Sequence, residues 1–242
     1  MKTGSAIPAK SAGQFGPDAY RLWRAQRLGV VTEDLERRLI LRLAGEVQGC
    51  RALDMGCGDG ALALALRERG APLVIGCDID PRMVASAVAE AVRRKTRSVR
   101  FLLANAEGLP FQDRSFDLVT MITVLSFVAE PETALREIAR VLKPGGRVII
   151  GDLGKWNLWA ASRRIRGWLG SAPMWRRASF RSARELRALV ERAGLRVDCV
   201  TGAVYYPRSA LLARVMAPLD SRLGALTTFG AAFIALRATQ PD

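Results

Sequence analysis

The chain has 242 residues, of which 50% are hydrophobic and 25% charged, a composition that excludes a wholly disordered or fibrous protein. No apolar stretch approaches the roughly 18 residues of a membrane-spanning helix, so an integral membrane protein is not expected. The 37 basic and 23 acidic residues leave a net charge of +14, which favours anionic partners, although an arginine-rich composition alone also produces such a charge.

Histidine is absent, which removes the usual general base at neutral pH and the commonest metal ligand. Catalytic triads built on histidine and histidine-ligated zinc sites are therefore excluded, and no metal is expected. The four cysteines show no CxxC spacing and are expected to be buried, reduced thiols, which suits the cytoplasm. The first residues lack the apolar segment of a signal peptide, which also favours a cytoplasmic protein.

The N-terminal part begins with residues 1–17, whose glycine, serine, alanine and proline content predicts a flexible tail. Two helices are expected next, near residues 18–28 and 33–47. Thr32 is placed to cap the second helix, because acidic residues that complement the helix dipole follow it directly.

Apolar strands then alternate with helices over residues 49–152. The expected strands are Arg51–Met55, Leu73–Cys77, Val99–Leu103, Phe116–Met121 and Arg147–Gly151. The expected helices are Ala61–Arg69, Pro81–Arg94 and Glu132–Leu142. This alternation predicts an α/β fold with a parallel sheet and helices on both of its faces.

The alternation stops after residue 152, and residues 153–180 hold four of the five tryptophans. Further on, Ser182 and Glu185 form a capping box for a helix that ends at Gly194. Two strands with a helix near residues 209–217 between them are expected to close the chain, at Arg196–Val204 and Ala231–Leu236.

Residues 153–180 also carry an amphipathic helix. Its apolar face contains Leu158, Ala161, Ser162, Ile165, Trp168, Leu169 and Ala172, and its basic face contains Arg163, Arg164 and Arg166. Three interpretations fit this pattern: a lid over an apolar pocket, a surface that docks on anionic lipid, and an arm that binds RNA. The lid is favoured and the RNA arm is the weakest, because no known RNA-binding motif accompanies the arginines.

A glycine-rich turn joins the first strand of the alternating segment to its first helix, at Gly56, Gly58 and Gly60. Glycines allow a ligand to approach the backbone closely, and the following helix presents free N–H groups. Asp78 ends the next strand, where a carboxylate can accept both hydroxyls of a ribose. The segment therefore predicts a site for an adenine nucleoside cofactor.

The glycine spacing fits both a dinucleotide fingerprint, which ends at Ala61, and a loop for S-adenosylmethionine. Asp54 and Asp59 flank this loop. Each would face the diphosphate of a dinucleotide at a cost of about 3–4 kcal/mol, at about 4–6 Å and an effective dielectric constant near 20. Because S-adenosylmethionine brings an ammonium and a sulfonium instead, the charges favour the methyl donor.

Four segments in order resemble the motifs of the class I S-adenosylmethionine-dependent methyltransferases, in the branch that includes ubiquinone and menaquinone biosynthesis enzymes. They are Leu53–Gly60, Gly76–Met83, Asn105–Phe111 together with Ser115–Val119, and Arg140–Arg147. The resemblance implies a Rossmann-like, doubly wound, mostly parallel sheet of seven strands with an antiparallel last strand, N-terminal helices and a helical lid insertion. It divides residues 18–242, one methyltransferase domain, into a helical cap (18–48), a cofactor-binding core (49–152), a lid or substrate insertion (153–180) and the C-terminal part of the sheet (181–242).

The resemblance also implies roles for individual residues. Asp54 and the three loop glycines would hold the methionine end of S-adenosyl-L-methionine, whose product is S-adenosyl-L-homocysteine. The other implied cofactor contacts are Asp78 at the ribose, Ile79 and Met83 against the adenine ring, Asn105 and Ala106 at the adenine edge, and Met121 at the ammonium. Most relatives have an aspartate in place of Asn105, but an asparagine oxygen can still accept from an adenine amino group.

The catalytic group is not identified by the sequence. Relatives often carry histidine after the fourth strand, where this chain has Ser126, so alignment of the acceptor with the methyl group is expected to provide most of the catalysis. The candidates for a base are Asp152, Tyr20 and Tyr205, and the candidates for substrate contact are Tyr20, Trp23, Ser126, Trp156 and Tyr205.

Three functions follow from these patterns. The first is methyl transfer to a small, apolar or amphiphilic acceptor, with peripheral contact at the inner, anionic face of a membrane. The second is methylation of RNA or protein through the basic surface, although a nucleic-acid partner is not favoured. The third is a non-catalytic, cofactor-binding subunit, and the sequence fixes no oligomeric state.

Overall fold

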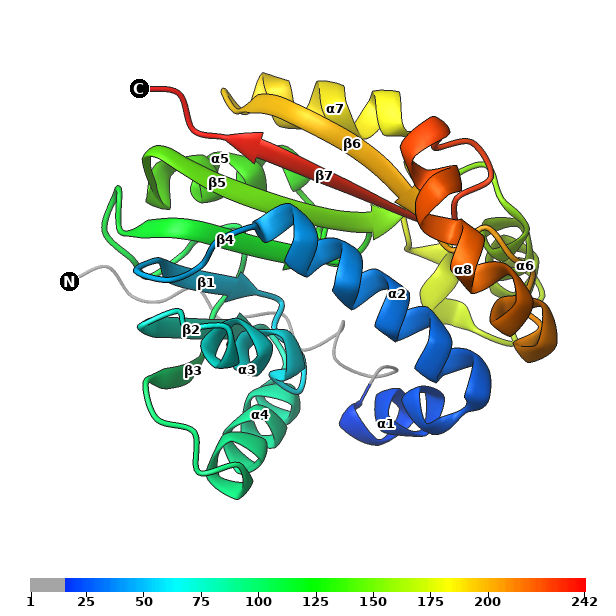
Figure 1. Ribbon diagram of the computed structural model, residues 1–242, viewed down its shortest axis with the longest axis horizontal. Coiled ribbons are helices and arrows are strands. Elements are labelled where there is room, and N and C mark those ends of the chain that lie inside the picture. Colours follow the sequence, from blue (N-terminus) through cyan, green and yellow to red (C-terminus); the bar gives the residue numbers. More distant parts are fainter. Residues whose placement is uncertain (1–15) are drawn as a thin grey trace.

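The predicted alternation forms a single seven-stranded sheet in the computed structural model, which describes residues 16–242 (Figure 1). The tail expected over residues 1–17 lies outside the described residues, apart from Gly16 and Pro17. The first helix already begins at Pro17.

All strands of the sheet run parallel except β7, which is antiparallel to both of its neighbours. The strands are β1 (Arg51–Met55), β2 (Leu73–Asp78), β3 (Val99–Leu103), β4 (Phe116–Ile122), β5 (Leu142–Leu153), β6 (Arg196–Ala203) and β7 (Phe233–Thr239). Their order in space is β3-β2-β1-β4-β5-β7-β6. The predicted fold class, a mostly parallel seven-stranded sheet with an antiparallel last strand, is confirmed.

The helices cover both faces of this sheet (Figure 1). They are α1 (Pro17–Ala25), α2 (Arg27–Ala44), α3 (Ala61–Glu68), α4 (Pro81–Arg93), α5 (Pro131–Val141), α6 (Leu158–Trp168), the short 3₁₀ helix η1 (Pro173–Arg176), α7 (Ala183–Arg192) and α8 (Ala210–Leu226). Helices α2, α3 and α8 pack on one face, and α5 and α7 pack on the other.

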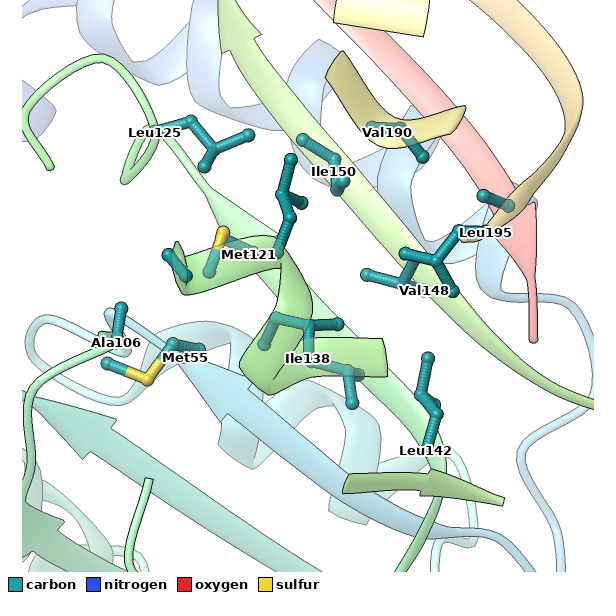
Figure 2. Close-up of a cluster of buried hydrophobic side chains, with 14 of the residues drawn as sticks. Met55, Ala106, Met121, Leu125, Ile138, Leu142, Val148, Ile150, Val190 and Leu195 are labelled. Atoms are coloured by element: carbon teal, nitrogen blue, oxygen red, sulfur yellow. The ribbon is translucent and has the colours of Figure 1, made fainter. Parts of the chain in front are cut away.

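The core follows from the period of two residues along each strand. On β5, Val148 and Ile150 face the layer of α5 and α7, whereas Ile149 between them faces the layer of α2, α3 and α8. Figure 2 shows Ile138 of α5 and Val190 of α7 in the same cluster as Val148 and Ile150. Because both faces of the central strands are buried, their apolar runs are nearly continuous.

The strand order reverses between β1 and β4, since the chain winds outward from β1 to β3 and in the other direction from β4 to β5. In sheets of this type, ligands bind beyond the carboxyl ends of the strands at such a reversal. The loops after β1, β2, β4 and β5 therefore form the place where a site is expected.

Two predictions about helix ends were wrong. Thr32 does not cap a helix but lies buried inside α2, where its hydroxyl donates to the Leu28 carbonyl oxygen and contacts the Tyr206 hydroxyl at 3.0 Å. The last helix extends to Leu226 instead of ending near residue 217, although Pro218 lies inside it. Its second half is held by Asp220, whose carboxylate accepts from the backbone N–H groups of two residues after β6.

The orientation of α6 also differs from the expectation. The side chains predicted to face inward are exposed, among them Leu158, Ile165 and Trp168. The buried face instead carries Trp159, whose indole N–H donates to the Tyr206 carbonyl oxygen at 2.7 Å. A helical wheel separates the two faces, but this tertiary hydrogen bond decides which of them faces the protein.

Of the four cysteines, Cys57 and Cys77 are buried as expected, whereas Cys50 is half-buried and Cys199 is exposed on β6. Within residues 16–242, none of the helices combines the length and apolarity needed to cross a membrane.

Candidate active site

The turn after β1 is shaped by three glycines with positive φ: Gly56 (72°), Gly58 (54°) and Gly60 (82°). A Cβ at Gly56 would lie 2.1 Å from a methyl group of Val124, so only glycine allows the loops after β1 and β4 to meet. At Gly58, the Cβ position faces open space instead. The second glycine therefore leaves its backbone accessible to a ligand beside the start of α3.

Asp54 lies on β1 directly before this turn, and it is 2% exposed. Its Oδ1 accepts a hydrogen bond of 2.7 Å from the Thr120 hydroxyl on β4. Its Oδ2 is buried and has no hydrogen-bond partner among the described residues. Burial raises the pKa of Asp54 to about 7, although the Thr120 hydroxyl and the Ala63 backbone N–H favour the ionised form. Among the described residues, no lysine or arginine forms an ion pair with Asp54, so a positively charged ligand would be a suitable partner for it.

Asp78 ends β2 and holds the glycine turn in place. One carboxylate oxygen accepts from the Gly58 backbone N–H at 2.9 Å, and the other accepts from the Asp80 backbone N–H at the same distance. Burial raises the pKa of Asp78, and backbone hydrogen bonds from Asp80, Gly58 and Ile79 oppose that effect. A carboxylate offers about four acceptor positions, so Asp78 can accept a further hydrogen bond from a ligand.

The residues expected around an adenine ring lie on the elements after β2 and β3. Ile79 is exposed beyond β2, whereas Met83 is buried on the first turn of α4. Asn105 follows β3, and its side-chain oxygen accepts from the Glu107 backbone N–H at 3.1 Å. Ala106 is buried.

Met121, on β4, is also buried and pairs in register with Met55 at the carboxyl end of β1. These residues surround the same edge of the sheet as the glycine turn.

A network from the N-terminal helices reaches the glycine turn, and no local sequence pattern predicts it. Arg24 of α1 forms ion pairs of 2.6 Å with Asp59 in the turn and with Glu33 on α2. The same guanidinium lies 4.4 Å from the centre of the Tyr20 ring, which stacks with Trp23. Arg24 and Asp59 are 35 positions apart in the sequence, and Arg24 and Glu33 are 9 positions apart, so local sequence patterns do not predict these ion pairs. They place α1, with Tyr20 and Trp23, beside the glycine turn.

Ser126 and Asp152 are brought together at the ends of β4 and β5. Asp152 is 1% exposed, and its two oxygens lie 2.5 Å from the Ser126 hydroxyl and 3.0 Å from a guanidinium nitrogen of Arg181. The Ser126 hydroxyl also lies 2.8 Å from the Ser179 carbonyl oxygen, which has no proton to give. While Asp152 is ionised, these two acceptors compete for the single Ser126 hydroxyl proton. Burial raises the pKa of Asp152, while Ser126 and Arg181 lower it.

This network fastens the segment after η1 to the site, because the Arg181 backbone N–H also donates to the Leu153 carbonyl oxygen at the end of β5. Arg181 and Ser179 were not predicted, since they lie more than 25 residues from their partners.

Two of the expected substrate residues lie apart from the glycine turn. Tyr205 follows β6, its hydroxyl donates to the Thr227 carbonyl oxygen, and burial raises its pKa to about 12. Trp156 is exposed before α6, with the Lys155 ammonium 5.4 Å from its ring centre. The structure thus groups Tyr20 and Trp23 with Asp59, and Ser126 with Asp152, but it does not bring Tyr205 and Trp156 to either group.

Glu36, one turn after Glu33 on α2, was not identified from the sequence. Burial raises its pKa to about 7, while the Arg163 guanidinium of α6 lowers it. Arg163 is itself partly buried, which lowers the pKa of its guanidinium to about 10. A carboxyl group with a pKa near neutrality is suited to proton transfer. However, the charged groups that act on Glu36 are Arg163, Glu33, Arg24 and Asp220, none of which lies in the glycine turn.

The charges of the glycine turn fit a cationic ligand. Asp59 is already paired with Arg24, so the charge left without a partner is that of Asp54. A diphosphate beside Asp54 would add negative charge where a buried carboxylate oxygen already lacks a partner. An ammonium or sulfonium would instead satisfy the free oxygen of Asp54. The site therefore fits S-adenosylmethionine better than a dinucleotide.

Comparison with known proteins gives the same result. Residues 53–150 match the family described as methyltransferase domain. The demethylmenaquinone methyltransferase of Thermus thermophilus is 46% identical over 116 residues, which cover 47% of this chain and 52% of that protein. The 27-O-demethylrifamycin SV methyltransferase of Amycolatopsis mediterranei is 36% identical over 124 residues, which cover 50% of this chain and 46% of that protein. The chain spans about half the length of the curated relatives it matches.

Similarity to solved structures extends over nearly the whole chain. The crystal structure of an S-adenosylmethionine-dependent methyltransferase from Thermotoga maritima aligns with a TM-score of 0.67 and 25% identity, and the match covers 92% of this chain and 95% of that chain. The resemblance expected from the sequence is confirmed: residues 53–150 carry the sequence of a methyltransferase domain, on the fold of the S-adenosylmethionine-dependent methyltransferases.

Proposed function

We propose that this protein is an S-adenosylmethionine-dependent methyltransferase. The observation that carries the proposal is Asp54, a buried carboxylate with an unpartnered oxygen directly before a turn of three glycines, at the reversal of the strand order. When bound, the cofactor supplies a methyl group on a positively charged sulfur, an already activated leaving group.

The chain's own residues would bind and orient this cofactor. Asp54 and the glycines at 56, 58 and 60 hold its methionine end, and Asp78 accepts the ribose hydroxyls. The remaining contacts are Ile79, Met83, Asn105 and Ala106 around the adenine, and the Met121 backbone near the ammonium. The N-terminal helix supports this assignment, because the ion pair between Arg24 and Asp59 fastens it beside the turn.

The proposed acceptor is a small, apolar or amphiphilic molecule. Support comes from the relatives, which are named for demethylmenaquinone and for 27-O-demethylrifamycin SV, two small-molecule acceptors. Methylation of RNA or protein has less support, since the basic charge is its main argument.

We further propose that alignment of the acceptor, and not a strong base, provides most of the catalysis. Burial raises the pKa of Tyr20 to about 12, so its hydroxyl keeps its proton at neutral pH, as does that of Tyr205. Both oxygens of Asp152 are engaged by Ser126 and Arg181. Asp54 and Glu36 both have a pKa of about 7, and Asp54 is assigned to the cofactor, so Glu36 is the carboxyl group left for the role if a base takes part.

The proposal is tested in two steps. Calorimetry should detect binding of S-adenosylmethionine and S-adenosylhomocysteine, and binding of a nicotinamide dinucleotide in their place would refute it. Cell extract is then incubated with the protein and a labelled methyl donor. Label in the lipid-soluble fraction supports the small acceptor, and label in RNA or protein supports the second function. Cofactor binding with no labelled product in any fraction identifies a non-catalytic subunit.

The role of the base is tested separately with Glu36→Gln. Alignment alone predicts an unchanged pH dependence of the turnover rate. Loss of an ionisation near pH 7, together with a fall of about 10²-fold or more in rate, would assign Glu36 as the general base.

A further inference from the structure

Helix α6 turns its apolar face to solvent. Leu158, Ile165 and Leu169 are exposed, and Trp168 has 82% of its surface exposed. The helix is fixed in this orientation, because Trp159 is buried and hydrogen-bonded on the opposite face and because the Gly167 backbone packs against η1. These apolar groups are therefore held outward by the fold.

Helix α8 also turns an apolar face to solvent, and it lies at the same end of the molecule as α6 (Figure 1). Leu211, Val215 and Leu219 recur at intervals of four residues along its outer side, and Leu211 and Val215 have 73% and 64% of their surface exposed. The two helices are tied together. The Arg208 guanidinium, just before α8, lies 5.5 Å from the Trp159 ring centre, and the Gly230 N–H after α8 donates to the Trp156 carbonyl oxygen.

The segments that contain α6 and α8 are rich in positively charged residues. Residues 153–184 contain eight lysines and arginines and no acidic residue. Lys155 pairs with Glu185, Arg181 pairs with the buried Asp152, and Arg163 is partly buried beside Glu36. The other five arginines are exposed. Residues 205–230 contain three arginines and a single acid, Asp220, which is buried. Apolar and aromatic side chains at a surface whose exposed charges are mainly positive match the interface of an anionic bilayer, which offers both hydrocarbon and phosphate.

We propose that the outer faces of α6 and α8 form a docking surface for a bilayer of anionic phospholipid. A second copy of the chain fits this surface less well, because a symmetric contact would place arginines against arginines with no exposed carboxylate to pair with them. RNA also fits less well, since the leucines and valines offer neither stacking nor hydrogen bonds to bases. Docking does not depend on the methyl-transfer step, but it would bring an apolar acceptor to the end of the sheet that α6 follows.

The test measures co-sedimentation of the full chain with equimolar phosphatidylcholine–phosphatidylglycerol vesicles and with phosphatidylcholine vesicles. We expect binding to the anionic vesicles that weakens with salt. Val215→Glu and Trp168→Glu should each reduce it about tenfold, because each removes an apolar contact and adds a repelled charge. Arg214→Gln and Arg222→Gln should each reduce it about fivefold.

The matched control is Val92→Glu, an exposed valine on α4 that is also followed by arginines. It should leave vesicle binding unchanged, and calorimetry with the cofactor should give the same affinity for all variants, so that a failure of docking is distinguished from a failure of the proposed function. Equal binding to both vesicle types, no binding at low salt, or an equal loss in Val92→Glu and Val215→Glu would overturn the proposal. A concentration-dependent dimer that Val215→Glu abolishes would overturn it as well.

Discussion

Replacing Asp54 by asparagine should stabilise the protein without cofactor and weaken its binding of cofactor. The folded protein holds the pKa of this carboxyl at about 7, against 3.8 for the free side chain. A folded-state pKa above the unfolded value means that the folded protein takes up a proton, so its stability falls as the pH rises from about 4 to about 7 and stays reduced above that. At about 1.4 kcal/mol for each tenfold change in the ionisation constant, the cost at pH 8 is on the order of 4 kcal/mol.

Asparagine removes this cost, and its side-chain oxygen can still accept from the Thr120 hydroxyl. The same change removes the negative charge that a cationic cofactor would meet. We therefore expect Asp54→Asn to bind cofactor more weakly by about 1.5–3 kcal/mol, the usual contribution of a hydrogen bond to a charged group.

The pH dependence of binding provides the sharper measurement. If the cofactor requires the ionised carboxylate, a pKa of about 7 makes binding about tenfold weaker at pH 6 than at high pH, and each binding event near pH 6 releases close to one proton. Calorimetry in two buffers with different ionisation enthalpies counts that proton. Asp54→Asn serves as the control and should release none at this site. The reasoning is refuted if the wild-type protein releases no proton near pH 6 and Asp54→Asn unfolds at lower urea than wild type at pH 8.

Three further substitutions test the remaining parts of the site. Asp78→Ala should weaken cofactor binding by about 1–3 kcal/mol through lost hydrogen bonds to the ribose, and an unchanged affinity in calorimetry would exclude that role. Arg24→Gln breaks two partly buried ion pairs, including the one to Asp59, and should cost about 1–2 kcal/mol in urea unfolding and speed amide exchange in α1. Exchange rates equal to wild type would show that the ion pairs do not hold that helix. Asp152→Ala leaves Arg181 without its buried partner and should destabilise the fold by about 3–5 kcal/mol. A loss of less than about 1 kcal/mol would mean that the pair is effectively solvated.

Several parts of the site were predictable because they depend on residues close together in the chain. The strand–turn–helix at Gly56 to Gly60 needs only local backbone geometry, and the structure shows all three glycines at positive φ. Asp78 was placed correctly at the end of β2, since the strand pattern fixes where the chain emerges. The capping box of Ser182 and Glu185 forms as expected, because both hydrogen bonds join residues within one helical turn.

Other parts depend on partners far away in the chain. Arg24 pairs with Asp59, and Asp152 pairs with Arg181. The residues next to them in the sequence do not indicate these pairs, because each charged side chain could equally well be solvated. The burial of a side chain also depends on residues that are distant in the sequence. Nothing near Glu36 in the sequence raises its pKa, which depends on the helices packed around it.

The sequence by itself determined the alternation of strands and helices, the glycine turn and the sign of its charge, because hydrophobic period, backbone freedom and formal charge are properties of neighbouring residues. Only the tertiary structure decided which face of α6 is buried, which carboxyl groups hold protons and which loops meet at the carboxyl edge of the sheet. These outcomes depend on desolvation and on hydrogen bonds such as that between Trp159 and Tyr206, which exist only after distant segments have packed together.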